Sequence, residues 1–240
     1  SAQSTPRNQL TPTPPMGWMT WNLFQGDISD KLIRETADAM VEGGYVDAGY
    51  KYIFIDDLWQ GGRDVHNNMI PDPKKFPNGI KALADYVHSK GMKLGIYSDA
   101  AQLTCGGWTA SLGFEEQDAR TFASWGIDYL KYDYCNAPID SATARQRYRI
   151  MADALSKSGR DIALGICEWG QRQCEEWCEE VGGQLWRTTY DVRDMWKDVT
   201  NEGGMGILDI VNITSPLSSY ARKGQWPDMD MLVVGLHGVS

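Results

Sequence analysis

The sequence predicts an α/β fold in which a parallel sheet curves into a (β/α)₈ barrel, the TIM barrel. Short runs rich in apolar, β-branched and aromatic residues alternate along the chain with amphipathic segments, a pattern typical of strands followed by helices. Three of the intervals between the ends of successive runs are 34 or 35 residues long, close to the roughly 30 residues of a βαβ unit. Several runs are apolar on both faces, which indicates a parallel sheet covered by helices.

Seven strands are expected, and helices are expected at 30–44, 80–91 and 115–126, among other segments. The first run leads into the sequence MGWMTWNLF rather than a Gly-rich phosphate turn, so a barrel is favoured over an open doubly wound sheet. A complete barrel needs eight units. Either 204–211 is a further strand, or the last βα unit is absent from this chain. The seven expected strands are 14–21, 50–57, 91–99, 126–133, 161–169, 184–191 and 228–235.

The domain organisation follows from the same pattern. Residues 1–13 are polar, lack periodicity and are predicted to be a flexible leader. Residues 14–240 are predicted to form one catalytic barrel domain that is incomplete at its C-terminus. The missing initiator Met is compatible with a cleaved signal peptide.

Composition excludes several classes of protein. With 42% hydrophobic and 23% charged residues, the 240-residue chain has the composition of a packed globule. A net charge of −9 disfavours a nucleic-acid partner, and no stretch of 18 apolar residues is present to span a membrane. Cys174 and Cys178 are four residues apart but lack the further ligands of a zinc site. No metal or organic cofactor is indicated, and nothing indicates an oligomeric state.

Acidic residues follow most of the expected strands. In a barrel the carboxyl ends of the strands form the active-site face, so these acids are expected to converge, although a single Asp after a strand often only caps the next helix. A divalent-metal isomerase, a catalytically silent sugar-binding barrel and a glycoside hydrolase could each use such a site, and the hydrolase uses the paired acids and the aromatic residues together. The acids are Asp56, Asp57, Asp99, Asp133, Glu168, Asp191, Asp228 and Asp230.

Strand parity refines this expectation. Lys131 and Asp133 are two residues apart and so share one face of a strand, where the ammonium would favour an ionised carboxylate suited to a nucleophile. Arg187, Thr189 and Asp191 share a face in the same way. Asp191 would act as a general acid if burial beside aromatic residues raises its pKa. These residues alone leave open which acid has which role.

The ordered motifs resemble those of glycoside hydrolase family 27, which contains α-galactosidases and α-N-acetylgalactosaminidases. The resemblance covers residues 14–235 and implies a retaining exo-α-galactosidase that acts on a small-molecule carbohydrate substrate without a cofactor. The matching motifs are MGWMTW (16–21), IDDLW (55–59), LGIYSD (94–99), LKYDYC (130–135), CEWG (167–170), WRTTYDV (186–192) and DMDML (228–232).

The resemblance also implies roles for individual residues. Asp133 matches the nucleophile and Asp191 the acid/base. Cys105 and Cys135 match a disulfide of the family, which implies an oxidising compartment, secreted or periplasmic. The substrate-binding residues implied are Trp21, Asp56, Asp57, Tyr97, Cys105, Lys131, Glu168, Arg187 and Asp230.

Sugar specificity is expected to depend on Glu168 and Asp56. Glu168 would fill the space of an acetamide group and accept from a free O2 hydroxyl, which favours galactose over N-acetylgalactosamine. Asp56 would contact O6, which argues against the β-L-arabinopyranosidases of the same family. Pro227 and Tyr190 depart from the family pattern, and Tyr190 is expected to narrow the pocket beside Asp191. The C-terminal β-sandwich usual in the family is not visible in the sequence.

Overall fold

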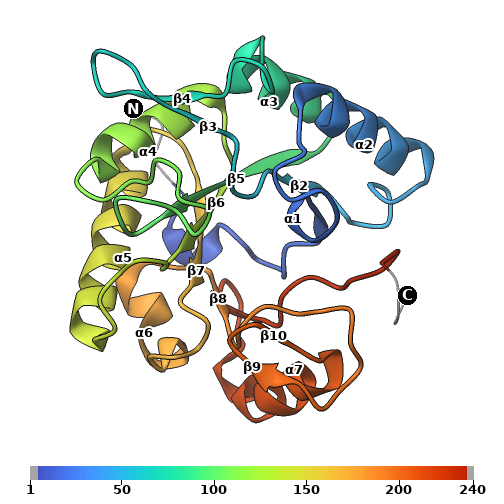
Figure 1. The fold of residues 1–240 in the computed structure, drawn as a ribbon, viewed down its shortest axis with the longest axis vertical. Coiled ribbons are helices and arrows are strands. Elements are labelled where there is room, and N and C mark those ends of the chain that lie inside the picture. The colour runs from blue at the N-terminus through green and yellow to red at the C-terminus, as the bar shows by residue number, and fades with distance from the viewer. Residues whose placement is uncertain (1–4, 237–240) are drawn as a thin grey trace.

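Seven parallel strands form one curved sheet at the centre of the structure, a computed structural model that describes residues 5–236 (Figure 1). Each barrel strand pairs with the barrel strand that precedes it in the chain, without the reversal of order that marks a doubly wound sheet. The predicted barrel topology is therefore confirmed over seven strands. In order across the sheet they are β1 (Gly17–Met19), β2 (Tyr52–Phe54), β5 (Lys93–Asp99), β6 (Tyr129–Asp133), β7 (Ala163–Cys167), β8 (Leu185–Arg187) and β11 (Trp226–Asp228).

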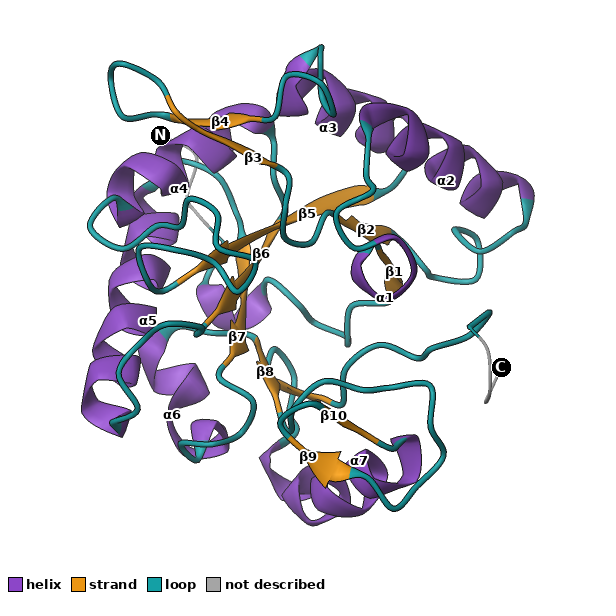
Figure 2. Ribbon diagram, in the orientation of Figure 1, coloured by secondary structure: helices purple, strands orange, loops and turns teal. Residues whose placement is uncertain are grey.

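Five helices cover the outer face of the sheet (Figure 2), and consecutive helices contact one another. Two of them begin at an oxygen cap: the Ser29 side chain accepts from the Leu32 amide, and the Asp140 side chain accepts from the Thr143 amide. The predicted helices 30–44, 80–91 and 115–126 are confirmed with small changes at their ends. The five are α2 (Asp30–Glu42), α3 (Gly79–Ser89), α4 (Glu115–Trp125), α5 (Ser141–Lys157) and α6 (Cys174–Val181).

Aromatic side chains pack together on the inner face of the sheet. The rings of Phe54 and Tyr129 meet edge to face with their centroids 4.7 Å apart. Gly165 makes room for this packing, because a Cβ atom at this position would overlap the Tyr129 hydroxyl. Leu10 packs against the same cluster from the N-terminal segment.

Part of the segment expected to be a flexible leader is anchored to the barrel. It contains a short 3₁₀ helix, η1 (Arg7–Gln9). The Arg7 guanidinium donates to the carbonyls of Gly182 and Ile162 and to the Gln184 side chain. Residues 5–13 thus cover the amino end of the sheet, and residues 1–4 lie outside the described residues.

The remaining elements lie in the connections that follow β1, β2 and β8. A hairpin after β2 lengthens the interval between Asp56 and Asp99, which end successive runs, to 43 residues. The loop after β8 contains a second hairpin and a helix. No helix in the described part of the chain is long and apolar enough to cross a membrane. These elements are α1 (Trp21–Phe24), β3 (Gln60–Arg63), β4 (Met69–Pro71), β9 (Thr200–Asn201), β10 (Gly204–Met205), α7 (Ile207–Thr214) and η2 (Ser215–Tyr220).

Two expected strands differ from the structure. The segment 204–211, considered as a barrel strand, contributes only the short antiparallel β10 and then enters α7. The seventh barrel strand is Trp226–Asp228 rather than 228–235, because Trp226 pairs with Leu185 and Asp228 with Arg187. Pro227 is tolerated in this strand because β11 pairs on one side only within the described residues.

Candidate active site

A cavity of about 200 Å³ opens at the carboxyl ends of the strands. Its volume is below the roughly 300–1,000 Å³ of pockets for drug-sized ligands, so it suits one small polar molecule. The structure brings ten of the eleven predicted catalytic and substrate-binding residues to this cavity. They are Trp21, Asp56, Asp57, Tyr97, Cys105, Lys131, Asp133, Arg187, Asp191 and Asp230.

Asp133, the last residue of β6, is held through both carboxylate oxygens. The Tyr97 hydroxyl donates to Oδ2 over 2.8 Å, and the backbone amide of Tyr134 donates to Oδ1 over 3.0 Å. Burial raises the pKa of Asp133 to about 6, although Lys131 and the Tyr97 hydroxyl both act to lower it. The expectation that Lys131 favours the ionised form is correct in direction, but burial outweighs the ammonium.

The paired acids after β2 are buried and hydrogen-bonded. Lys131 Nζ lies 2.8 Å from Asp56 Oδ2. Asp57 accepts from the backbone amides of Leu58 and Gly106, over 2.7 and 2.8 Å. Burial raises the pKa of Asp57, while these amide hydrogen bonds act to lower it. Two carboxylates and an ammonium therefore offer acceptors and a donor along one wall of the cavity.

Arg187 joins the two acids on the opposite wall. Its Nη2 atom lies 3.0 Å from Asp191 Oδ1 and 3.0 Å from Asp230 Oδ2. Burial acts to raise the pKa of Asp191, but the charges of Arg187 and Lys131 bring it below the usual value. The expected rise in the pKa of Asp191 is therefore wrong: the Asp191 side chain is 51% exposed and paired with a cation.

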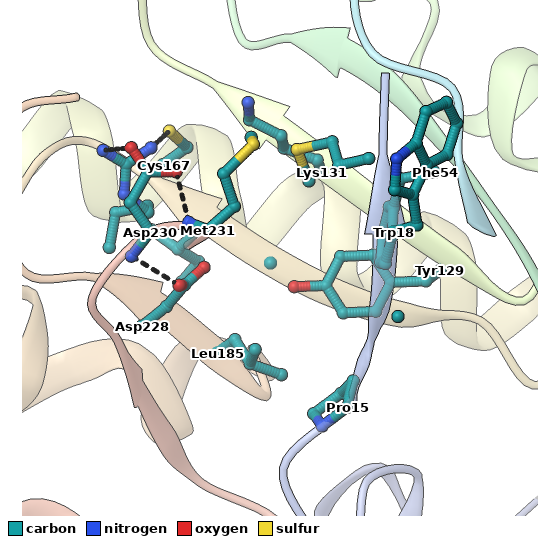
Figure 3. A pocket seen from close by; sticks show the side chains of 15 residues that line it. Pro15, Trp18, Phe54, Tyr129, Lys131, Cys167, Leu185, Asp228, Asp230 and Met231 are labelled. Atoms are coloured by element: carbon teal, nitrogen blue, oxygen red, sulfur yellow. Dashed lines mark hydrogen bonds and ion pairs between the residues drawn. The ribbon is translucent and has the colours of Figure 1, made fainter. Parts of the chain in front are cut away.

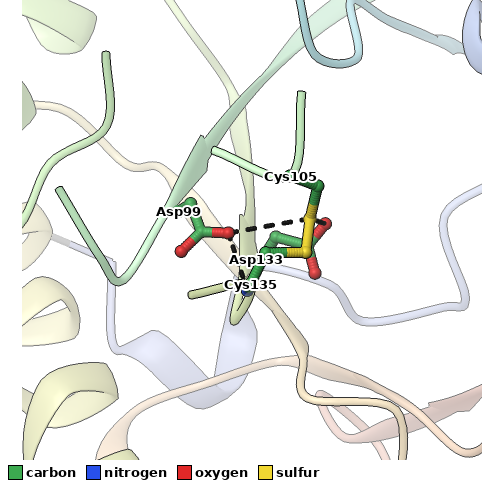
Figure 4. A group of neighbouring side chains, drawn as sticks. All are labelled: Asp99, Cys105, Asp133 and Cys135. Carbon is green, nitrogen blue, oxygen red and sulfur yellow. Dashed lines mark hydrogen bonds between the residues drawn. A yellow bond between two sulfur atoms is a disulfide. The ribbon is translucent and has the colours of Figure 1, made fainter. Parts of the chain in front are cut away.

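The predicted Cys105–Cys135 disulfide is present, with the two Cα atoms 5.0 Å apart (Figure 4). Cys105 Sγ lies 3.1 Å from Asp133 Oδ2, so the disulfide forms part of the wall beside this carboxylate. Beneath it, burial and then the charge of Asp133 raise the pKa of Asp99 to about 9, which keeps Asp99 neutral at pH 7. These four side chains are close enough to surround an ion, but sulfurs joined in a disulfide cannot act as thiolate ligands.

Glu168 is the predicted residue that the structure does not bring to the cavity. Parallel pairing places Asp133 beside Cys167, so Cys167 faces inward and Glu168, the next residue, faces the helix layer. Its side chain is fully buried there and contacts Arg172. Burial raises the pKa of Glu168 to about 7, while Arg172 acts to lower it.

Besides Cys135 of the predicted disulfide, five further residues line the cavity, and of these five only Tyr190 was singled out from the sequence. Trp169 lies in the turn after β7, with φ +61°, so strand alternation does not place it. The Trp169 and Tyr190 rings lie 5.9 Å apart at 31°. Glu202 is in the turn between β9 and β10, where no periodic pattern applies. The five are Asn22, Trp169, Tyr190, Glu202 and Met231.

A second cavity, of about 170 Å³, lies inside the curve of the sheet (Figure 3). It shares Lys131, Arg187, Asp230 and Met231 with the first cavity, so the two are neighbours. Its other walls include the aromatic side chains of Trp18, Phe54 and Tyr129.

Comparison with known proteins decides the family. A family model described as "Alpha galactosidase A" matches residues 13–240. The chain belongs to this family. It is 50% identical over 230 residues to alpha-galactosidase A of Cellvibrio japonicus (95% of this chain, 56% of the relative) and 50% identical over 235 residues to alpha-galactosidase 2 of Arabidopsis thaliana (97% and 57%).

Solved structures of the family agree with this placement. Alpha-galactosidase I of Mortierella vinacea superposes with a TM-score of 0.92 at 39% identity, over 97% of this chain and 62% of that chain. The alpha-galactosidase of Saccharomyces cerevisiae, in a structure with raffinose, superposes with a TM-score of 0.93 at 36% identity, over 99% and 56%. The chain spans about half the length of the curated relatives it matches.

Proposed function

We propose that this protein is a retaining exo-α-galactosidase, which hydrolyses terminal α-D-galactosyl residues by double displacement. One observation carries the proposal: Asp133 and Asp191 line one cavity together with Asp56, Asp57 and Lys131. Two carboxyl groups at the reacting bond are what glycoside hydrolysis requires, and a small pocket with acceptors and a donor on its wall suits a single sugar ring. Membership in a family of alpha-galactosidases supports the same reaction.

In the first displacement, an Asp133 oxygen forms a bond to the anomeric carbon while the glycosidic bond breaks. Asp191 gives its proton to the departing oxygen. In the second, Asp191 takes a proton from water, the water oxygen attacks the anomeric carbon, and Asp133 is released. The hydrogen bonds from Tyr97 and the Tyr134 amide hold the attacking carboxylate in place.

The reaction needs one proton on the pair of carboxyl groups, with Asp191 protonated and Asp133 ionised. Burial raises the pKa of Asp133 to about 6, while the charges of Arg187 and Lys131 lower the pKa of Asp191 against the effect of burial. The pair therefore carries one proton at mildly acidic pH, and the fraction of molecules that hold this proton on Asp191 follows the same dependence on pH. Hydrolysis is expected to be fastest in that range.

Recognition of the sugar uses the walls on either side of these two acids. Asp56 and Asp57 accept from the O4 and O6 hydroxyls, and Lys131 donates to O3 and O4. Arg187 donates at O2, while Trp21 and Tyr97 lie against the ring. The raffinose in the structure of the Saccharomyces cerevisiae relative supports an oligosaccharide substrate with a terminal galactose.

Hydrolysis of aryl glycosides by the full-length protein tests this proposal. We expect the α-galactoside to be hydrolysed much faster than the α-N-acetylgalactosaminide and the β-L-arabinopyranoside. Preference for either of the other two substrates would assign the pocket to that sugar instead. Binding of galactose without hydrolysis would identify a catalytically silent barrel.

The disulfide at the site fits an oxidising compartment. We therefore propose that the protein is secreted or periplasmic. Fractionation of the native host would test this location.

A further inference from the structure

Glu168 lies on the opposite side of β7 from the active-site cavity and has one charged partner there. Its Oε2 is 3.4 Å from Arg172 Nη1, and the Glu168 and Arg172 side chains are 0% and 9% exposed. Oε1 has no hydrogen-bond partner among the described residues. A sugar in the cavity therefore does not meet this carboxylate directly.

Arg172 connects the loops that follow β6 and β7. Its Nε donates to the Ile139 carbonyl over 2.9 Å, and its guanidinium lies over the Tyr134 ring, 4.5 Å from the ring centroid. Its Nη1 also lies 3.4 Å from the Glu168 carbonyl oxygen. Because Tyr134 directly follows Asp133, one guanidinium links the loop of the attacking carboxylate to the turn after β7.

The turn after β7 has an unusual backbone. Trp169 has φ +61°, in the left-handed region that bulky residues rarely adopt, and Gly170 has φ +70°. Such a conformation persists only where neighbouring groups hold it. It directs the Trp169 ring into the cavity wall, against the ring of Tyr190.

We propose that Glu168 and Arg172 form a positioning pair, which holds the strained turn so that Trp169 keeps its place in the wall of the sugar pocket. The inference rests on the proposed function where it concerns sugar affinity, and on geometry alone where it concerns Trp169. It assigns Glu168 a role through Trp169 in place of a direct contact with the O2 hydroxyl.

Titration of Glu168 gives the pair a measurable signature. Burial raises the pKa of Glu168 to about 7 against the effect of Arg172. The other titratable groups that face it are Tyr134 after β6, Tyr148 on α5 and Cys174 on α6, and burial raises the pKa of each, so all three remain neutral around pH 7. Protonation of Glu168 therefore removes the ion pair as the pH falls through about 7.

The first test needs no substrate. The full-length protein is labelled with 5-fluorotryptophan, and the Trp169 signal is identified in the ¹⁹F NMR spectrum by its loss in Trp169→Phe. We expect this signal to shift with a midpoint of about pH 7, and the shift to disappear in Glu168→Gln. The proposal would be overturned if the Trp169 signal showed no shift with a midpoint of about pH 7, or if that shift persisted in Glu168→Gln.

The second test separates positioning from direct contact. At pH 8, Glu168→Gln should raise KM about tenfold for an aryl α-galactoside and by the same factor for its 2-deoxy analogue. Tenfold corresponds to the loss of one charge-assisted hydrogen bond. The value of kcat should stay nearly unchanged. Arg172→Gln should give the same rise, and the double variant no more than either single variant. A rise in KM for the galactoside alone would show that Glu168 contacts O2. If the wild type hydrolyses neither substrate, the proposed function fails, and the NMR titration alone decides on the positioning pair.

Discussion

Replacement of Lys131 by Met would test whether the active site depends on a buried ion pair. The Lys131 and Asp56 side chains are 16% and 4% exposed, with Nζ and Oδ2 2.8 Å apart. Met keeps the length of the side chain and removes its charge. The Asp56 side chain would then remain buried, with the Asp57 amide as its one remaining hydrogen-bond donor among the described residues.

The expected loss is large because one partner is removed and the other stays buried. Breaking a buried ion pair in this way costs about 3–5 kcal/mol of unfolding free energy. For a domain of about 150–250 residues, each kcal/mol shifts Tm by about 2–4 °C, so we expect Tm to fall by roughly 6–20 °C. Urea and thermal unfolding of the full-length protein, followed by circular dichroism, would measure both quantities.

A second ion pair in the same chain provides a matched control. Lys81 Nζ and Asp85 Oδ2 are also 2.8 Å apart, but their side chains are 64% and 61% exposed. We expect Lys81→Met to leave the unfolding midpoint unchanged. Adding Asp56→Asn to Lys131→Met should restore part of the lost stability. An unchanged midpoint in Lys131→Met, or an equal loss in Lys81→Met, would refute the argument from burial.

Three further predictions concern catalysis and the disulfide. The rate of galactose release from raffinose should decline above an apparent pKa of about 6. Burial raises the pKa of Asp133 to that value, and above it Asp133 and Asp191 together lose their one proton. A rate that stays constant from pH 5 to 8 would contradict this. Asp191→Asn should slow raffinose hydrolysis by about 10²–10⁴-fold, as expected for loss of a general acid, and should slow the first step with an activated aryl galactoside far less; equal losses would remove Asp191 from that role. Joint replacement of Cys105 and Cys135 by Ser opens a loop of 30 residues and should lower the unfolding free energy by about 3.6 kcal/mol. Unfolding in urea would measure this loss, and an unchanged midpoint would contradict it.

The sequence was sufficient to predict the barrel and most of the pocket because both follow from local alternation. Lys131 and Asp133 share a strand face, and parallel strands bring such faces together. Asp191 instead lies in the loop after β8, where it pairs with Arg187. The same alternation, applied to the end of β7, would have placed Cys167 inside and Glu168 outside. The resemblance to a family instead assigned Glu168 to the substrate.

Other features depend on long-range packing. Glu202 reaches the cavity from a hairpin after β8 whose placement no sequence period predicts. The pKa order of Asp133 and Asp191 depends on how much water reaches each carboxyl group and on the position of the Arg187 guanidinium. Anchoring of the N-terminal segment rests on Arg7, whose partners lie more than 150 residues away in the sequence.

Covalent labelling during turnover tests the central claim most directly. The full-length protein would be mixed with a slowly hydrolysed fluorinated α-galactoside, quenched in acid and digested, and its peptides weighed by mass spectrometry. If Asp133 is the nucleophile, the peptide that contains Asp133 should carry the added mass of one fluorinated galactosyl group. Hydrolysis without any labelled peptide, or with the label on the peptide that contains Asp191, would contradict it.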